Sequence, residues 1–201
     1  VKLLTQMFGD RMLIANATGC SSIWGAAAGV TPYTTNEQGQ GPAWSNSLLE
    51  DNAEFGYGML LATQARRERL ASKMTKAFSV ASDSLRLLME DWIAHLSESE
   101  GTQQRAAKLR AALLEEKTNQ PLLEAIYDDQ DLFVKPSQWM IGGDGWAYDI
   151  GYGGIDHVLA SGADVNMLVL DNEVYSNTGG QTSKATPASA IAKFAASGKY
   201  A

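Results

Sequence analysis

The sequence has little of several features that mark common protein classes. It contains one cysteine among 201 residues, so it cannot form an internal disulfide framework. It has no run of eighteen apolar residues, which argues against a transmembrane helix. No stretch has the layout of a signal peptide. A single cysteine also fits a reducing compartment, so we expect a cytoplasmic protein that does not bind membranes.

Basic charge is scarce as well. There are 16 Lys and Arg residues against 23 Asp and Glu residues, a formal net charge of −7. The basic residues form no cluster, so we do not expect nucleic acid as a partner. The length is sufficient for one α/β domain with its own hydrophobic core. The class suggested by composition is therefore a small α/β protein whose function must be sought in its motifs.

Two polar clusters follow two short apolar runs in the C-terminal half. Trp139–Ile141 ends at the cluster Gly142–Trp146, and Val165–Leu170 ends at Asp171-Asn172. A helix-like segment, Trp146–Ala160, lies between the two runs. Strand, helix and strand over this length predict a right-handed βαβ unit with parallel strands. Both clusters should then lie at the carboxyl ends of neighbouring strands, where open α/β sheets bind ligands.

The two clusters contain the ligand types that a hard cation prefers. Asp144 offers a carboxylate oxygen, and Asn172, 28 residues later, offers an amide oxygen. A backbone carbonyl just beyond Asn172 could supply a third oxygen, and Mg²⁺ commonly shares such ligands with phosphates. Gly143 and Gly145 allow close approach of the backbone to an anion, and the start of the following helix favours a diphosphate.

A third polar cluster follows the first apolar run of the chain. A short helix is expected over residues 1–11, and Met12–Ala17 reads as a buried strand. Thr18, Gly19, Cys20 and Ser21 follow it, again at the ligand edge of the sheet. The ordinary interpretation of a lone cysteine such as Cys20 is a small buried thiol. Residues 29–58 contain few apolar runs and are expected to form a long structured loop.

The middle of the chain has a helical pattern. Apolar residues from Leu70 to Leu96 recur at steps of three and four, which predicts one amphipathic helix. Two shorter helices are expected over Gln103–Glu116 and Leu122–Tyr127. We interpret residues 60–135, approximately, as a helical insertion that serves packing or an interface. His95, in this insertion, and His157, in the helix after Asp144, are expected to be structural. Arg66, Arg67 and Arg69 should form a solvated face or a partner contact.

The segment after Asn172 is rich in glycine and polar residues. Glu173–Thr186 includes Tyr175, Ser176 and Asn177, and its position after a strand predicts a ligand loop; the alternative is a surface turn. Pro187 suits the first turn of a last helix, Ala188–Ser197. Glycine is unfavourable inside helices, so the three glycines of the expected helix after Asp144 suggest close approach of another backbone. These are Gly151, Gly153 and Gly154.

A GDG motif followed by a distant Asn is weak evidence alone, because a turn in a Rossmann-like domain could produce it. The longer string from Gly143 to Pro187 is far more specific, and Ile14–Gly25 and Gly41–Gly56 support it. Together they resemble the C-terminal thiamine-diphosphate-binding domain of the pyruvate:ferredoxin (or flavodoxin) oxidoreductases. The resemblance covers most of the chain and is weakest in the middle. It implies an α/β thiamine-diphosphate-binding fold, mostly parallel sheet flanked by helices, forming one domain over residues 1–201 of a longer polypeptide.

The resemblance also implies roles for individual residues. Asp144, Asn172 and the Val174 carbonyl would bind Mg²⁺, although some family members have Thr where this chain has Asn172. Asn177 would face the reacting group, and Cys20 would be one ligand of a [4Fe-4S] cluster whose other ligands lie outside this chain. The remaining residues implied to contact the cofactor are Thr18, Gly19, Ser21, Gly143, Gly145, Trp146, Tyr175 and Ser176. The carboxylate that activates the aminopyrimidine would come from another domain.

The activity implied by the resemblance is oxidative decarboxylation of pyruvate to acetyl-CoA and CO₂. Electrons would pass through [4Fe-4S] clusters to ferredoxin or flavodoxin, and coenzyme A would accept the acetyl group. The full-length enzyme would be a homodimer, and the isolated 201 residues would be inactive. Two alternatives remain at this point. One is a non-oxidative thiamine-diphosphate decarboxylase or synthase, which would need no iron. The other is a non-catalytic assembly domain, which would not bind the cofactor.

Overall fold

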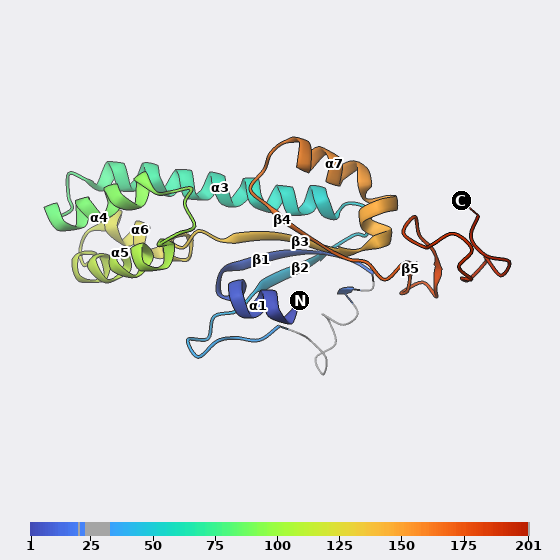
Figure 1. Cartoon of the computed structure of the whole chain (residues 1–201). Coiled ribbons are helices and arrows are strands. Elements are labelled where there is room, and N and C mark those ends of the chain that lie inside the picture. The colour runs from blue at the N-terminus through green and yellow to red at the C-terminus, as the bar shows by residue number, and fades with distance from the viewer. Residues whose placement is uncertain (20, 23–32, 201) are drawn as a thin grey trace. The chain divides into compact units, whose positions relative to one another are not determined.

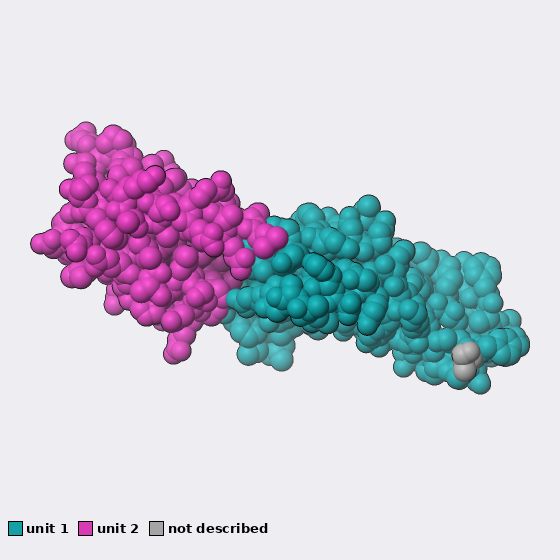
Figure 2. Space-filling view, turned by 90° about the horizontal axis from the view of Figure 1, so that it is seen from above, with its two compact units in different colours: residues 1–60, 137–201 teal, residues 61–136 magenta. Residues whose placement is uncertain are grey.

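The computed structural model describes residues 1–19, 21–22 and 33–200. Cys20 therefore lies outside the described residues. The chain divides into two compact units, coloured separately in Figure 2. The first unit comprises Val1–Leu60 and Ser137–Ala201, and the second comprises Leu61–Pro136. The bounds of the second unit resemble those of the expected helical insertion. That the whole chain is one domain with an insertion stays a prediction.

The first unit contains a parallel four-stranded sheet (Figure 1). Its order is β2 (Ala43–Ser47), β1 (Met12–Ala17), β3 (Ser137–Gly143) and β4 (Asn166–Leu170). In the register, Gly143 pairs with Leu170. The residues that follow these two positions therefore leave the sheet side by side. The prediction of an α/β fold with a parallel sheet flanked by helices is confirmed.

The two faces of the sheet are covered by different helices, because alternate side chains of a strand point to opposite faces. On one face, α1 (Lys2–Phe8) contributes Leu4 and Phe8. On the other, α7 (Tyr152–Ala160) contributes Ile155 and Val158 beside the first turns of α3. The strand residues on the α1 face are Met12, Ile14, Trp139, Ile141, Leu168 and Leu170, and those on the α7 face are Ala15, Ala17, Met140, Met167 and Val169.

The expected loop over residues 29–58 contains two regular elements that the sequence did not reveal. One is the edge strand β2, and the other is the start of α3 (Asn52–Ala77). The β2 sequence Ala-Trp-Ser-Asn-Ser has no apolar run, because the strand lies at the sheet edge and Trp44 alone packs on the core cluster of the α1 face. An edge strand needs fewer apolar residues than a central one.

The second unit is a set of helices around its own core. They are the rest of α3, then α4 (Asp83–Ala94), α5 (Thr102–Glu116), α6 (Pro121–Asp128) and a 3₁₀ turn at Gln130–Leu132. The prediction of one helix through Leu96 was wrong, because the chain turns after Ala77 and Ser82 caps a new helix. The Ser82 hydroxyl accepts a hydrogen bond from the Leu85 N–H at 3.2 Å. The apolar spacing continues across the break because α3 and α4 face the same core.

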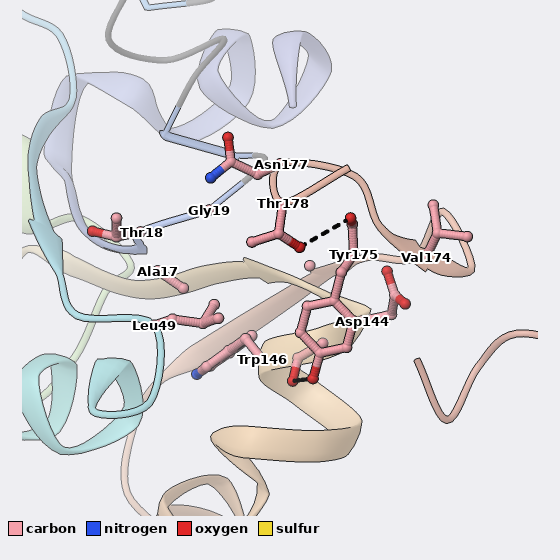
Figure 3. Close-up of a pocket in the computed structure, with 12 residues that line it drawn as sticks. Ala17, Thr18, Gly19, Leu49, Asp144, Trp146, Val174, Tyr175, Asn177 and Thr178 are labelled. Carbon is pink, nitrogen blue, oxygen red and sulfur yellow. Dashed lines mark hydrogen bonds between the residues drawn. The ribbon is translucent and has the colours of Figure 1, made fainter. Parts of the chain in front are cut away.

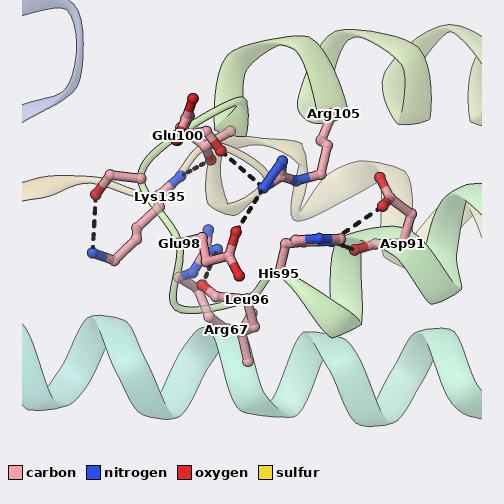
Figure 4. Close-up of polar contacts among 10 residues, drawn as sticks. Arg67, Asp91, His95, Leu96, Glu98, Glu100, Arg105 and Lys135 are labelled. Carbon is pink, nitrogen blue, oxygen red and sulfur yellow. Dashed lines mark hydrogen bonds and ion pairs between the residues drawn. The ribbon is translucent and has the colours of Figure 1, made fainter.

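Arg67 is part of that core and not of a solvated face, which corrects the prediction for this residue. Its guanidinium donates to the carbonyl of Leu96 at 2.9 Å (Figure 4). It also donates to the carbonyl of Leu132 and lies 4.9 Å from the centre of the Trp92 ring. Burial lowers the pKa of Arg67 to about 10. Nearby, His95 pairs with Asp91 at 3.1 Å. Arg66 and Arg69 are exposed, as expected.

The helix expected between the two C-terminal strands is interrupted. A π-helical turn, Gly145–Ile150, precedes α7, and the Gly151 N–H donates to the Trp146 carbonyl at 2.9 Å. π-Turns occur frequently at functional sites. A Cβ atom at Gly151 would lie 2.4 Å from the Trp146 ring, and one at Gly154 would lie 2.6 Å from the Glu54 carboxylate, whereas Gly153 is open. Close approach at these glycines is thus mainly to side chains, and the expectation of a second backbone was wrong.

The last helix predicted, Ala188–Ser197, is absent. Ser189 and Phe194 have φ values of 67° and 65°, which a right-handed helix cannot contain. Instead, β5 (Val174–Tyr175) and β6 (Gln181–Thr182) form a hairpin, and Gln181 bridges to Lys193. The apolar side chains of this segment, Ile191 and Phe194, are exposed, and most of its backbone hydrogen bonds close within the segment. No helix in the described part of the chain is long and apolar enough to cross a membrane.

Two glycines of α3 should respond oppositely to substitution by alanine. A Cβ at Gly56 would lie 2.7 Å from Met140 Cγ and 3.1 Å from Ala15 Cβ, whereas a Cβ at Gly58 meets nothing within 4 Å. Gly58→Ala should raise the free energy of unfolding by up to about 1 kcal/mol through helix propensity. Gly56→Ala should lower it by about 1–3 kcal/mol through overpacking. Urea unfolding of both variants beside the parent sequence tests this; equal shifts of the same sign would contradict the packing of α3 on β1 and β3.

Candidate functional site

A cavity of about 90 Å³ lies at the carboxyl ends of β1 and β3 (Figure 3). Three segments form its walls: the end of β1 with Thr18 and Gly19, the turn Gly143–Trp146, and the loop from Val174 to Thr178. Leu49 adds an apolar side chain. Pockets that bury a whole small ligand usually measure about 300–1,000 Å³. This cavity therefore suits one end of an elongated ligand.

Polar atoms of three residues converge beside this cavity. One end of the Asn172 side-chain amide lies 2.8 Å from Asp144 Oδ1 and 2.9 Å from the Val174 carbonyl oxygen. The other end of the amide contacts the Ser176 hydroxyl. With the amide nitrogen facing Asp144 and Val174, it donates a hydrogen bond to each, and the amide oxygen accepts from the Ser176 hydroxyl, so both ends of the amide are satisfied without a cation. A bound cation would require the opposite orientation, with the amide oxygen turned toward Asp144 and Val174.

The spacing of this cluster fits magnesium. In an octahedron with Mg–O distances of 2.0–2.1 Å, neighbouring oxygens lie roughly 2.9 Å apart. Asp144 is only 1% exposed, and its Oδ2 has no hydrogen-bond partner within the described chain. Burying a carboxylate without a partner is costly. The described residues contain no group of three or more His, Cys, Asp or Glu side chains that could hold a metal, so one carboxylate, one amide and one carbonyl would form the ligand set.

The electrostatic setting also favours a cation. No Lys or Arg is among the residues that line the cavity. The first unit as a whole has eleven Asp and Glu residues against five Lys and Arg residues. An anionic group such as a diphosphate is repelled by this excess of negative charge. A divalent cation beside Asp144 would offset that repulsion and link the anion to the protein.

Gly142 is a structural requirement of the site that we did not single out from the sequence. A Cβ atom there would lie 2.5 Å from the Trp146 ring and 2.9 Å from Ala17 Cβ. Trp146 is fully buried and lines the cavity, and its indole N–H has no hydrogen-bond partner among the described residues. Two glycines, Gly142 and Gly143, precede Asp144, and only Gly143 was assigned a role from the sequence. The presence of a second glycine was the signal that could have identified Gly142.

Tyr175 joins the loop to the turn that contains Asp144. A Cβ atom at Gly145 would lie 2.4 Å from the Tyr175 ring, so only glycine leaves room for this contact. The Tyr175 hydroxyl donates to the Gly145 carbonyl at 3.4 Å. Burial, followed by the nearby Asp149 carboxylate, raises the pKa of Tyr175 to about 12. Tyr175 therefore stays neutral at physiological pH and acts here as a packing and hydrogen-bonding group.

The residues after β1 divide between the cavity wall and the local backbone. Thr18 and Gly19 line the cavity, and the Thr18 hydroxyl donates to the Ser47 carbonyl. Ser21 is buried, and its hydroxyl donates to the Ala17 carbonyl at 3.1 Å. It is not among the lining residues, and neither is Ser176, which contacts Asn172 instead. Thr178, a member of the predicted ligand loop that was given no role of its own, also lines the cavity, and the lining residues that the sequence did not single out are Ala17 and Leu49.

Comparison with known proteins identifies the family of domains to which this site belongs. Residues 133–198 match the model of the thiamine pyrophosphate enzymes' C-terminal TPP-binding domain. A pyruvate-flavodoxin oxidoreductase of Klebsiella pneumoniae is 63% identical over 199 residues, which are 98% of this chain and 17% of that protein. The chain carries the thiamine-diphosphate-binding domain of the pyruvate:ferredoxin and flavodoxin oxidoreductases.

Other relatives extend this family. A pyruvate:ferredoxin oxidoreductase of Moorella thermoacetica is 55% identical over 100% of the chain and 18% of its own length. A mitochondrial NADP⁺-dependent pyruvate dehydrogenase of Euglena gracilis is 54% identical over 99% of the chain and 11% of its own length. The chain thus spans less than a fifth of these relatives. The similarity to this thiamine-diphosphate-binding domain supports thiamine diphosphate as the cofactor and does not favour a non-oxidative enzyme or an assembly domain.

Substitution of the candidate metal ligands should separate the two possible orientations of the Asn172 amide. Asp144→Ala in the full-length protein should abolish Mg²⁺-dependent binding of thiamine diphosphate, because it removes the only carboxylate of the set. Asn172→Asp keeps an oxygen beside Asp144 and should retain the metal.

Calorimetric titration with thiamine diphosphate, with and without Mg²⁺, measures both effects. Asp156→Ala is a matched control, since it removes an exposed carboxylate from α7. Unchanged cofactor affinity in Asp144→Ala would rule out the proposed metal site.

Proposed function

We propose that this chain is the thiamine-diphosphate- and Mg²⁺-binding part of an enzyme that oxidatively decarboxylates pyruvate to acetyl-CoA and CO₂. The electrons would leave through [4Fe-4S] clusters to ferredoxin or flavodoxin. The observation that carries the proposal is the buried Asp144 carboxylate at the ligand edge of the sheet. Its Oδ2 has no hydrogen-bond partner among the described residues, and it lies beside the Asn172 amide and the Val174 carbonyl. Its place in a chain 63% identical to a pyruvate-flavodoxin oxidoreductase supports the choice of reaction.

Each part of the site has a proposed task. Asp144, Asn172 and the Val174 carbonyl hold Mg²⁺, which binds the diphosphate. When bound, thiamine diphosphate supplies the electron sink for decarboxylation, and the protein supplies binding and orientation. Asn177, which lines the cavity, is the residue proposed to face the reacting group. The other proposed contacts are Thr18, Gly19, Ser21, Gly143, Gly145, Trp146, Tyr175 and Ser176.

The size of the cavity supports a site shared with other domains. At about 90 Å³ it can enclose only part of the cofactor. The relatives are more than five times as long as the segment they share with this chain. We infer that the rest of the cofactor, with the carboxylate that activates it, is covered by other domains of a homodimeric full-length enzyme in the cytoplasm. Pyruvate and coenzyme A would enter between those parts.

The activity is tested with the full-length protein, pyruvate, coenzyme A, thiamine diphosphate and Mg²⁺. We expect coenzyme-A-dependent reduction of flavodoxin or ferredoxin and formation of acetyl-CoA. The isolated 201 residues should give no turnover, because they contain one thiolate and lack the partner domains. Decarboxylation without electron transfer would instead indicate a non-oxidative enzyme, and absence of cofactor binding would indicate an assembly domain.

Cys20 distinguishes the oxidoreductase from any other thiamine-diphosphate enzyme. A cluster needs several thiolates, so the other ligands must lie elsewhere in the full-length protein. Cys20→Ser should leave thiamine diphosphate binding intact, alter or remove the electron paramagnetic resonance signal of one cluster, and abolish reduction of the external carrier. If Cys20 is only a packing thiol, iron content and activity will be nearly unchanged and stability slightly lower.

A further inference from the structure

Three backbone carbonyls of the ligand loop converge on one side chain, the ammonium group of Lys199. Lys199 Nζ donates to the carbonyls of Ser183 at 2.9 Å, Lys184 at 3.0 Å and Thr186 at 2.6 Å. A lysine ammonium has three N–H donors and no acceptor, so all three donors are used. Converging carbonyl dipoles repel one another, and a positive charge between them removes that repulsion. Lys199 is thus the centre of a small internal cation site.

This carbonyl cluster is connected to the candidate metal ligands by one side chain. The Thr186 hydroxyl donates to the carbonyl of Glu173 and accepts the Ser183 N–H at 2.9 Å. Glu173 has a φ of 65°, an uncommon conformation for a residue other than glycine, and it directly precedes Val174. The contact from Thr186 therefore fixes the peptide group immediately before Val174, and the Val174 carbonyl itself accepts the Ser176 N–H at 3.0 Å.

The segment that contains Lys199 is anchored to the loop by its backbone as well. Lys193 N–H donates to the Gly180 carbonyl at 2.8 Å, and the Ser189 N–H donates to the Lys199 carbonyl at 2.8 Å. Gly198 has a φ of 94°, and a Cβ atom there would lie 2.9 Å from the Ser189 carbonyl oxygen. The Lys193 bond joins residues 187–200 to the ligand loop, whereas the Ser189 bond closes this segment on itself; together they bring Lys199 to the carbonyls.

We propose that Lys199 is a positioning residue for the cofactor site, and that its ammonium group holds the ligand loop in the conformation that presents the Val174 carbonyl to the metal. The proposal rests on the proposed function, since it assumes that Asp144, Asn172 and Val174 bind Mg²⁺ with the diphosphate. It assigns Lys199 no contact with the cofactor. The affinity for the metal and diphosphate should therefore depend on a positive charge remote from both.

The test compares Lys199→Met with Lys193→Met in the full-length protein, using calorimetric titration with Mg²⁺ and thiamine diphosphate. Lys199→Met should weaken cofactor binding by about 10- to 100-fold, the range typical of groups that orient metal ligands. Lys193→Met is the matched control. It removes a charge from the same segment, where the Lys193 ammonium lies over the Phe194 ring at 5.4 Å, and it should bind as the parent does.

Two further measurements separate positioning from general destabilisation. Hydrogen exchange of the cofactor-free Lys199→Met protein should be faster in residues 173–186 and unchanged in β1, β3 and α7. Thr186→Val removes the hydroxyl that reaches Glu173 without removing the carbonyl that binds Lys199, and it should weaken cofactor binding in the same direction. This second variant also keeps the proposal testable if Lys199→Met fails to fold.

The outcomes are distinguishable from those that concern the function itself. Failure of the parent protein to bind thiamine diphosphate with Mg²⁺ would overturn the proposed function. Tight binding by the parent together with equal affinity in Lys199→Met or in Thr186→Val would overturn the positioning role alone. Equal weakening in Lys199→Met and Lys193→Met would also overturn it, because the effect would then come from net charge and not from the carbonyl contacts.

Discussion

The buried carboxylate of Asp144 is the constraint around which the first unit is arranged. A carboxylate that is 1% exposed and has one oxygen without a hydrogen-bond partner among the described residues is unfavourable unless a cation satisfies it. The surrounding structure nevertheless fixes it firmly. Gly142 leaves space for Trp146 beneath it, and Gly145 leaves space for Tyr175 beside it. Both aromatic rings line the cavity beside Asp144, and the low exposure of the carboxylate strengthens its interaction with a cation.

Much of this site follows from the register of parallel strands and could be predicted from sequence. Gly143 pairs with Leu170, so Asp144 and Asn172 emerge together although 28 residues separate them. The apolar runs before each polar cluster are enough to predict that geometry, because parallel strands buried on both faces consist largely of apolar residues. The same reasoning located β1 with its observed bounds, Met12–Ala17.

The features that could not be predicted are those whose sequence signal is weak or is shared by two structures. Strand β2 is polar because it lies at the edge of the sheet, and so its pattern resembles a loop. The break at Ser82 left no gap in the apolar spacing, since α3 and α4 pack on one core. Arg67 was predicted to be a surface residue because it is charged and lies among other arginines. In the structure, two backbone carbonyls and the Trp92 ring contact its guanidinium in place of solvent. In each case a tertiary contact decided the structure.

Asp144 and Val174, two residues of the candidate metal site, are fixed in position by different kinds of contact. Asp144 follows a central strand directly, so sheet hydrogen bonds and core packing fix it. Val174 follows Glu173, whose left-handed conformation is unfavourable for a residue with a side chain. That conformation persists only if surrounding contacts outweigh its cost. Two contacts act on Glu173 directly: its N–H donates to Asp171 Oδ1 at 3.0 Å, and its carbonyl accepts from the Thr186 hydroxyl; Lys199 in turn donates to the Thr186 carbonyl at 2.6 Å. If the Val174 carbonyl binds the metal as proposed, metal binding and these side-chain contacts would stabilise the same conformation of the loop.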